Sequence, residues 1–264
     1  MVKKILSILT WIVTAAGIVM LFVFSRNSYL GTPLKSIAIT ISRQHDKGFL
    51  DREQMTSQLV TICDTAKKTA IGNINMAKVE KKLANNPWIK SATSYIDMDG
   101  RLLVKAEEFE PVLRVFAAEG GSVYVTKEGR IIPACATYTP RVLVANGNFK
   151  FNAQNTTQAM LQDSIVMGSN IAEAFEICRA IENDALMKSC IGQLYCGANN
   201  DFELTVNGLQ AKVIFGNADN AADKLLRLKL FLKQKGQSEE LKHIKSLNLK
   251  YKNQLVVCTK NKSK

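Results

Sequence analysis

The sequence predicts an α+β protein that begins with a transmembrane helix and continues into two domains, the second built on a largely antiparallel sheet. An uncharged run of 20 residues near the N-terminus predicts the membrane helix. Alternating apolar and polar residues flank Asp99-Gly100 and Asn207-Gly208, which predicts two β-hairpins. Elsewhere, apolar residues recur at helical spacing. A chain of 264 residues, 47% of them hydrophobic, suffices for an anchor and one or two modest domains.

The membrane helix is predicted over residues 5–24, because about 20 apolar residues cross the hydrocarbon core as a helix. No small-residue cleavage site follows this run, which favours an uncleaved anchor over a signal peptide. Lys3 and Lys4 precede the run, and only Arg26 follows it closely. By the positive-inside rule, residues 1–4 are expected in the cytoplasm and the bulk of the chain outside it.

The first extracytoplasmic domain is predicted over residues 36–109. Residues 25–35 are polar and contain glycine and proline, so they are expected to form a linker into it. At the start of the domain, every second residue is apolar, which predicts a half-buried strand. The apolar positions are Ile37, Ile39 and Ile41.

Two helices and a hairpin complete this domain. Asp51, with Gln54 three residues later, is expected to cap the first helix. The second begins at Asn75 and ends before Pro87, because proline cannot continue the helical hydrogen-bond ladder. The hairpin at Asp99-Gly100 follows, with strands over 92–96 and 102–109. The order strand, helix, helix, strand, strand is typical of a POTRA domain.

The second domain is predicted over residues 110–258, and residues 259–264 are expected to form a flexible tail. It contains an amphipathic helix with an apolar face formed by Ile171, Ala174, Phe175, Cys178 and Ile181. The Asn207-Gly208 hairpin joins strands over 202–206 and 211–215. The final strands are expected over 244–251 and 255–258.

A second helix of this domain is predicted over residues 219–235. Its apolar residues are expected to point inward and its basic residues mostly outward. The apolar residues are Leu225, Leu228, Phe231 and Leu232, and the basic ones are Lys224, Arg227, Lys229, Lys233 and Lys235.

Several segments resemble, in order, motifs of the FtsQ (DivIB) family of bacterial cell-division proteins. Residues 85–92, NNPWIKSA, resemble the segment that closes the second POTRA helix of that family. Residues 104–114, VKAEEFEPVLR, resemble its junction into the second domain, and residues 123–133 resemble the hairpin beyond it. Residues 246–254, SLNLKYKNQ, resemble its strand near the C-terminus.

The resemblance implies a non-enzymatic, membrane-anchored divisome scaffold that helps coordinate septal cell-wall synthesis. It implies partners of the FtsB and FtsL type, which are small single-pass division proteins. One of these adds a strand to the sheet edge of the second domain. Carried over by position, the partner-binding residues are Lys250, Tyr251, Lys252, Asn253 and Leu255. Lys250 stands where the family often has arginine, which would lose a bidentate ion pair.

The resemblance also implies a location in the inner membrane at the division septum, with a single span and a cytoplasmic N-terminus. No cofactor, small-molecule substrate or nucleic-acid partner is expected. The net charge of +12 is compatible with nucleic acid, anionic lipid or an acidic partner, but no basic block is interleaved with aromatic residues. A solvated basic surface is the favoured interpretation.

No catalytic or metal site is predicted. The six cysteines form no C-x-x-C pair, and His45 and His243 are the only histidines. Neither histidine accompanies a nucleophile motif. For the cysteines, buried free thiols are favoured over disulfides, although Cys178, Cys190 and Cys196 are close enough in sequence to pair.

Three other functions are alternatives to the scaffold. A POTRA-bearing outer-membrane protein would need many barrel strands, which the helical C-terminal region cannot supply. An anchored cell-wall enzyme would need a nucleophile or a metal cluster. A generic periplasmic assembly or adhesion module is opposed only by the motif series, and it remains the alternative hypothesis.

Overall fold

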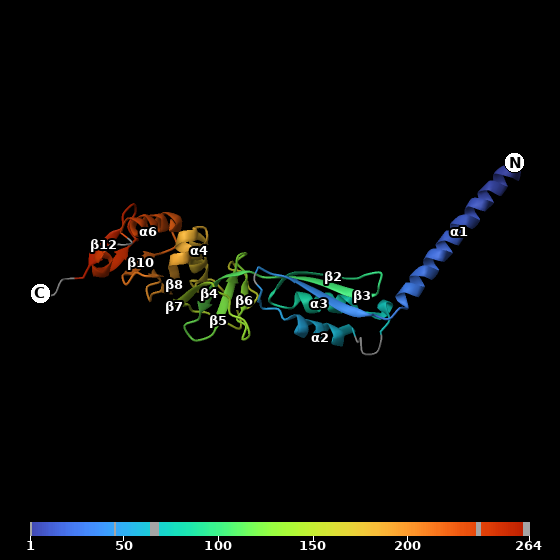
Figure 1. Ribbon diagram of the computed structural model, residues 1–264, viewed down its shortest axis with the longest axis horizontal. Helices are drawn as coiled ribbons and strands as arrows, with labels where there is room; N and C mark the ends of the chain where they lie inside the picture. Colours follow the sequence, from blue (N-terminus) through green and yellow to red (C-terminus); the bar gives the residue numbers. More distant parts are fainter. Residues whose placement is uncertain (1, 45, 64–68, 236–238, 261–264) are drawn as a thin grey trace. The chain divides into compact units, whose positions relative to one another are not determined.

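The computed structural model describes residues 2–44, 46–63, 69–235 and 239–260. The chain divides into two compact units, Met1–Glu108 and Phe109–Lys264. Figure 1 shows the elements of each unit along the chain. The mixed α+β class and the N-terminal apolar helix predicted from the sequence are confirmed.

The N-terminal helix α1 runs over Val2–Leu30 and is longer than the predicted span. Its stretch Leu9–Leu30 is long and apolar enough to cross a membrane. Residues 25–30, expected to belong to a linker, continue this helix. No proline or glycine falls between residues 25 and 30, and Gly31 and Pro33 follow directly after its last turn.

The rest of the first unit is a three-stranded sheet with two helices (Figure 1). Its elements are β1 (Ser36–Ser42), α2 (Arg52–Cys63), the short 3-10 helix η2 (Ile71–Asn73), α3 (Met76–Ala84), β2 (Ile89–Ile96) and β3 (Arg101–Glu108). The strand order is β1-β3-β2, with β1 parallel and β2 antiparallel to the central β3. The predicted order strand, helix, helix, strand, strand is confirmed.

Local capping chemistry positions both helices as the sequence predicts. The Asp51 carboxylate accepts the backbone N–H of Glu53 at 2.8 Å and of Gln54 at 3.3 Å. The Asn75 side chain accepts the N–H of Lys78 at 3.0 Å. The helices and sheet share one apolar core. Its buried members include Met55, Leu59, Cys63, Val79, Leu83, Leu102, Val104 and Ala106.

The second unit contains a nine-stranded mixed sheet with helices packed against it. Its first elements are β4 (Pro111–Phe116), β5 (Ser122–Thr126), β6 (Ile131–Pro133), β7 (Leu143–Gly147), α4 (Ile171–Glu182) and α5 (Ala185–Cys190). The later ones are β8 (Ile191–Cys196), β9 (Phe202–Val206), β10 (Lys212–Gly216), α6 (Ala221–Lys235), the 3-10 helix η3 (Glu239–His243), β11 (Ile244–Asn248) and β12 (Val256–Thr259).

The strand order of this sheet is β12-β11-β10-β9-β8-β7-β4-β5-β6. Five of its eight described neighbouring pairs are antiparallel, as predicted for a largely antiparallel sheet. The other three are parallel and join β4 to β7, β7 to β8 and β10 to β11. Each parallel pair spans a longer connection, and α6 fills the one between β10 and β11.

Helix α4 confirms the predicted amphipathic face, because Ile171, Ala174, Phe175, Cys178 and Ile181 are all buried. The hairpin at Asn207-Gly208 is also confirmed. Gly208 has φ +80°, and the Leu209 N–H donates to the Val206 carbonyl at 3.1 Å. Among the basic residues of α6, which are predicted to point mostly outward, Lys224 is buried, with 5% of its surface exposed. All six cysteines are unpaired thiols.

Gly147, at the end of β7, requires glycine for two independent reasons. Its φ is +107°, which other residues adopt only at a cost, and an added Cβ would lie 2.1 Å from the Cys196 carbonyl oxygen on β8. We therefore expect Gly147→Ala to lower the free energy of unfolding by about 3 kcal/mol or more. Denaturant unfolding of the full chain in detergent, followed by circular dichroism, measures this loss.

Gly208→Ala is the matched control, because Gly208 also has positive φ but no heavy atom within 4 Å of an added Cβ. It should cost only the backbone strain, about 1–2 kcal/mol. Equal losses in the two variants would contradict the steric role of Gly147.

Candidate functional site

The strand β12 forms one end of the nine-stranded sheet and is open to solvent. It pairs with β11 on one side, and no other described strand pairs with its outer side. All four of its residues are exposed, including Val256 at 39% and Val257 at 40%. Because neighbouring residues of a strand point to opposite faces, this end of the sheet exposes apolar surface on both faces.

The backbone direction of β12 identifies the groups that face outward. The Lys260 N–H donates inward to the His243 carbonyl at 2.7 Å. Successive N–H groups of a strand point to alternate sides, so the N–H of Cys258 also faces β11. The N–H groups of Val257 and Thr259 therefore face the open side, where an added strand would bond to them.

The opposite end of the same sheet is closed. Strand β6 is followed along its outer side by residues 158–161. The Ile131 N–H donates to the Ala159 carbonyl at 2.8 Å, and the Gln158 N–H donates to the Ile131 carbonyl at 2.8 Å. A covered edge is the usual way in which a sheet avoids unwanted pairing. Among the described residues the two ends of this sheet therefore differ, and the β12 end is the one that is left uncovered.

The predicted partner-binding residues lie in the turn between β11 and β12, since β11 ends at Asn248 and not at residue 251 as predicted. Tyr251 is 52% exposed, and Lys252 and Asn253 are exposed beside it. Asn253 has φ +58°, a left-handed conformation that asparagine tolerates better than most residues. Leu255 is partly buried and packs against the core of the unit.

Arg227 of α6 holds this turn in place. Its guanidinium donates to the Tyr251 carbonyl at 2.7 Å and also to the Gln254 carbonyl. The same side chain pairs with Asp223 one helical turn earlier, at 3.0 Å. Both carbonyl bonds come from the same terminal nitrogen, Nη1, whose two N–H groups serve two acceptors, so one side chain holds two points of the turn. Sequence reasoning assigned Arg227 to a solvated face and missed this role.

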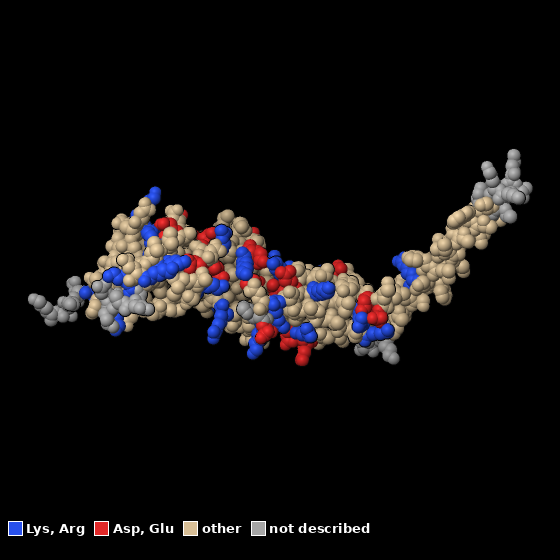
Figure 2. All heavy atoms as spheres, turned by 45° about the horizontal axis from the view of Figure 1, so that its top comes forward, with Lys and Arg blue, Asp and Glu red and all other residues tan. Residues whose placement is uncertain are grey.

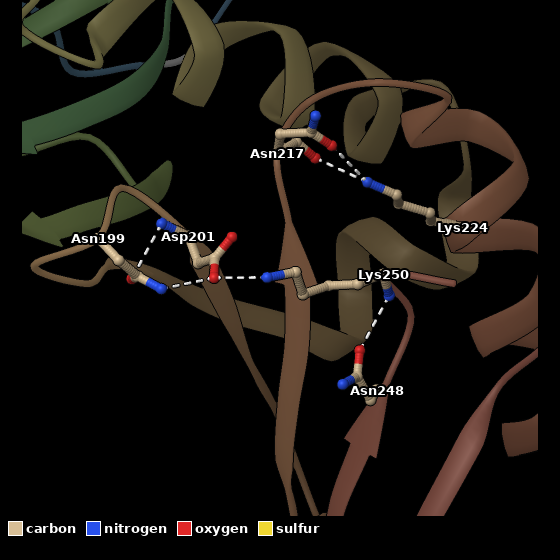
Figure 3. A network of polar contacts seen from close by, with 6 residues as sticks. All are labelled: Asn199, Asp201, Asn217, Lys224, Asn248 and Lys250. Carbon is tan, nitrogen blue, oxygen red and sulfur yellow. Dashed lines mark hydrogen bonds and ion pairs between the residues drawn. The ribbon is translucent and has the colours of Figure 1, made fainter. Parts of the chain in front are cut away.

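Lys250 is engaged inside the unit, as Figure 3 shows. Its Nζ lies 2.7 Å from the Asp201 carboxylate, and Asn199 donates to the same carboxylate oxygen at 2.6 Å. Its stem passes over Gly216, where an added Cβ would lie 2.8 Å from Cγ of Lys250. The lysine therefore joins the turn to the β8–β9 connection.

Lys224 forms the second part of the network in Figure 3. Its Nζ donates to the backbone carbonyl of Asn217 at 2.9 Å and to its side-chain oxygen at 3.0 Å. It also lies 5.0 Å from the centre of the Phe215 ring, within cation–π range. Burial lowers the pKa of Lys224 below its ordinary value, since the charged form loses hydration.

The other candidates from the sequence do not assemble into a site. His243 ends the 3-10 helix η3, and His45 lies outside the described residues. No group of three or more His, Cys, Asp or Glu side chains suited to a metal ion occurs in the described ranges. On the face shown in Figure 2, basic and acidic side chains are interspersed. The strand-addition edge is therefore the candidate that the structure develops furthest.

Two family models match the chain. The model described as FtsQ/DivIB, C-terminal related, matches residues 110–259, which is more than half of the chain. The model described as a POTRA-like domain matches residues 33–107. No individual curated protein gives a significant match. The matched regions together cover both sheets except Glu108 of β3, and the second region ends at the last residue of β12.

The hydrogen bonds of Arg227 predict a measurable loss of stability when its side chain is removed. We expect Arg227→Ala to lower the free energy of unfolding by about 2 kcal/mol, because two carbonyl groups lose a charged donor. Lys212→Ala breaks an exposed ion pair with Glu203 and is the control, with an expected loss within about 1 kcal/mol. Denaturant unfolding of both variants compares them, and equal losses would contradict the clamping role.

Lys224 predicts a dependence of stability on alkaline pH. Because its pKa is lowered on folding, the unfolded chain binds this proton more tightly than the folded chain. The contribution of Lys224 to the free energy of unfolding therefore rises with pH, from the folded pKa up to the ordinary value of 10.5. Lys224→Met should lack this rise when both proteins are unfolded by denaturant between pH 7 and pH 10.5. Parallel pH curves for the two proteins would refute the prediction.

Proposed function

This chain belongs to the FtsQ/DivIB family of cell-division proteins, and we propose that it is a non-enzymatic divisome scaffold that binds small single-pass partners through the β12 edge. The partners are of the FtsB and FtsL type. The observation that carries the proposal is the open, fully exposed strand β12 at the end of a sheet whose other end is closed. The N-terminal apolar helix anchors the protein in a membrane.

Strand addition at β12 explains how affinity would arise. The outward N–H groups of Val257 and Thr259, with the carbonyl groups beside them, supply ladder bonds to an extended partner segment. Because Val256 and Val257 lie on opposite faces, the partner segment buries apolar surface on both. Such a segment would carry apolar residues that lie next to these two valines.

The turn before β12 supplies specificity. Tyr251 offers a large exposed ring with a polar tip, a residue type common at binding hot spots. Lys252, Asn253 and Leu255 continue the same surface towards the strand. Lys250 already pairs with Asp201, so we assign it the task of holding the turn in its binding position and not of meeting a partner carboxylate.

Helix α6 extends the proposed surface. Leu226 and Leu230 lie one turn apart on its outer face and are 52% and 58% exposed. Arg227 of the same helix bonds to the turn that precedes β12. A partner with a helical segment next to its added strand would bury these leucines.

Topology and location follow from the same proposal. The N-terminus lies in the cytoplasm, and the part of the first unit that follows α1 lies outside the cytoplasmic membrane together with the second unit. The protein gathers at the division septum. The proposal assigns the protein no catalytic step. Its contribution to septal wall synthesis is to bring partners together at the membrane.

The test is capture of FtsB- and FtsL-type proteins of the same organism by the full chain in detergent. Val257→Pro removes an outward N–H and leaves the inward bonds of β12 to β11 in place. We expect it to reduce capture at least tenfold. Val257→Ala keeps the backbone donor, so it is the matched control. Its capture of the partners should fall by a several-fold smaller factor than that of Val257→Pro. Tyr251→Ala reports on the turn and should also weaken capture.

Capture by the wild type that persists in Val257→Pro would move the binding site away from the β12 edge. No capture by the wild type would favour the generic assembly or adhesion module over the divisome scaffold. Circular dichroism of each variant, compared with the wild type, tests whether a loss of capture comes from unfolding.

A further inference from the structure

The end of the anchor helix is bonded to the first domain. The Tyr29 hydroxyl of α1 donates to the Asp97 carbonyl at 2.8 Å. Immediately after the helix, the Ile71 N–H donates to the Thr32 carbonyl at 2.9 Å, and the Lys35 N–H donates to the Gly100 carbonyl at 2.8 Å. The bonds of Tyr29 and Lys35 place the β2–β3 turn, Asp97 to Gly100, beside the last turn of α1.

The β2–β3 turn is itself rigid. The Gly100 N–H closes it on the Asp97 carbonyl at 3.0 Å, and Gly100 has φ +79°. Arg101 binds the carboxylates of Asp97 and Asp99, each at 2.8 Å. One guanidinium thus offsets part of the charge of two carboxylates at the tip of the hairpin.

Met98 is the side chain that this turn presents outward. It is 96% exposed, which is the largest exposure among the exposed large hydrophobic side chains of the described residues. Asp97 and Asp99, the residues on either side of Met98, are held by hydrogen bonds and ion pairs, so the exposure of Met98 does not come from a loose chain end. An unbranched, flexible thioether on a rigid turn suits insertion into an irregular apolar environment.

The length of the anchor sets the depth of this turn. If residues 5–24 span the hydrocarbon core, Tyr29 lies five residues beyond it, or about 7.5 Å along the helix. If the span is Leu9–Leu30, Tyr29 lies at the boundary of the core itself. The headgroup layer extends about 5–8 Å outward from the core on each side. In both cases the hydroxyl that holds Asp97 lies within the headgroup layer or at its edge.

We propose that the β2–β3 turn is a membrane-contact site, in which Met98 inserts into the headgroup layer of the bilayer that α1 spans. Tyr29 fits this layer as an amphipathic aromatic residue and acts as the tether that fixes the turn there. Arg26 and Lys35 are exposed close by in the sequence, and they favour anionic headgroups. The inference rests on the membrane anchor and is independent of partner binding at β12.

The contact restricts the first domain. With α1, Tyr29 and the inserted Met98 all at one surface, the domain has two attachments to the bilayer and not one flexible tether. The three-stranded sheet is then held with its β2–β3 end against the lipid. This double attachment fixes the distance from the membrane at which the domain meets its partners.

The experiment uses the full chain with 13C-labelled methionine methyl groups, reconstituted in lipid nanodiscs and observed by NMR. Nanodiscs with and without a gadolinium-chelating headgroup lipid are compared, and Met98→Leu assigns the Met98 signal. We expect the Met98 signal to fall at least threefold with the paramagnetic lipid. A water-soluble gadolinium complex should attenuate Met98 less than Met167, which is also highly exposed, at 72%.

The proposal would be overturned if the paramagnetic lipid left the intensity of the Met98 signal unchanged and the soluble complex attenuated Met98 as strongly as Met167. Tyr29→Phe removes the hydroxyl and keeps the ring, and it should at least halve the effect of the paramagnetic lipid on Met98. An unchanged effect in this variant would overturn the assignment of Tyr29 as the tether. Capture of division partners is measured separately, so its failure and the failure of this inference are distinguishable.

Discussion

The need of backbone groups for hydrogen-bond partners governs the second unit, because its sheet of nine strands must end somewhere on both sides. At β6 the chain supplies its own cover, with residues 158–161 bonded along the edge. At β12 the outer N–H and carbonyl groups meet no described strand. The asymmetry gives the sheet one closed end and one end suited to a partner, and the proposed function depends on that difference.

The open end is held in shape by charged side chains from neighbouring elements. Arg227 bonds to two carbonyl groups of the turn before β12, and Lys250 ties the same turn to Asp201. Lys224 supports the adjoining Asn217 from the buried side of α6. A turn held from two directions loses little conformational entropy on binding, so more of the contact energy appears as affinity. The rigidity of the site thus depends on residues that need not touch the partner.

The first unit is also held in shape by bonds between neighbouring elements, at the end that carries the anchor helix. Helix α1 does not give way to a flexible segment at residue 25, and its last turn bonds to the β2–β3 hairpin through Tyr29. A protein that gathers partners at a membrane benefits from this arrangement, because a domain at a fixed distance from the membrane presents its binding surface to every partner at that same distance. The exposed Met98 is explained if lipid covers it.

The sequence alone determined the anchor, the order of elements in the first domain, both glycine hairpins and the buried face of α4. These features follow from local rules, since hydropathy, capping side chains and turn glycines act within a few residues. The sequence also predicts a partner-binding region near residue 250, through resemblance to a family, and this stays a prediction. It did not reveal the burial of Lys224, the task of Arg227 or the pairing of Lys250, because each depends on a partner that lies 7 to 49 residues away in the chain. Only the tertiary structure decided which sheet end is open, since closure of β6 and exposure of β12 depend on how distant segments pack and not on the residues of either strand.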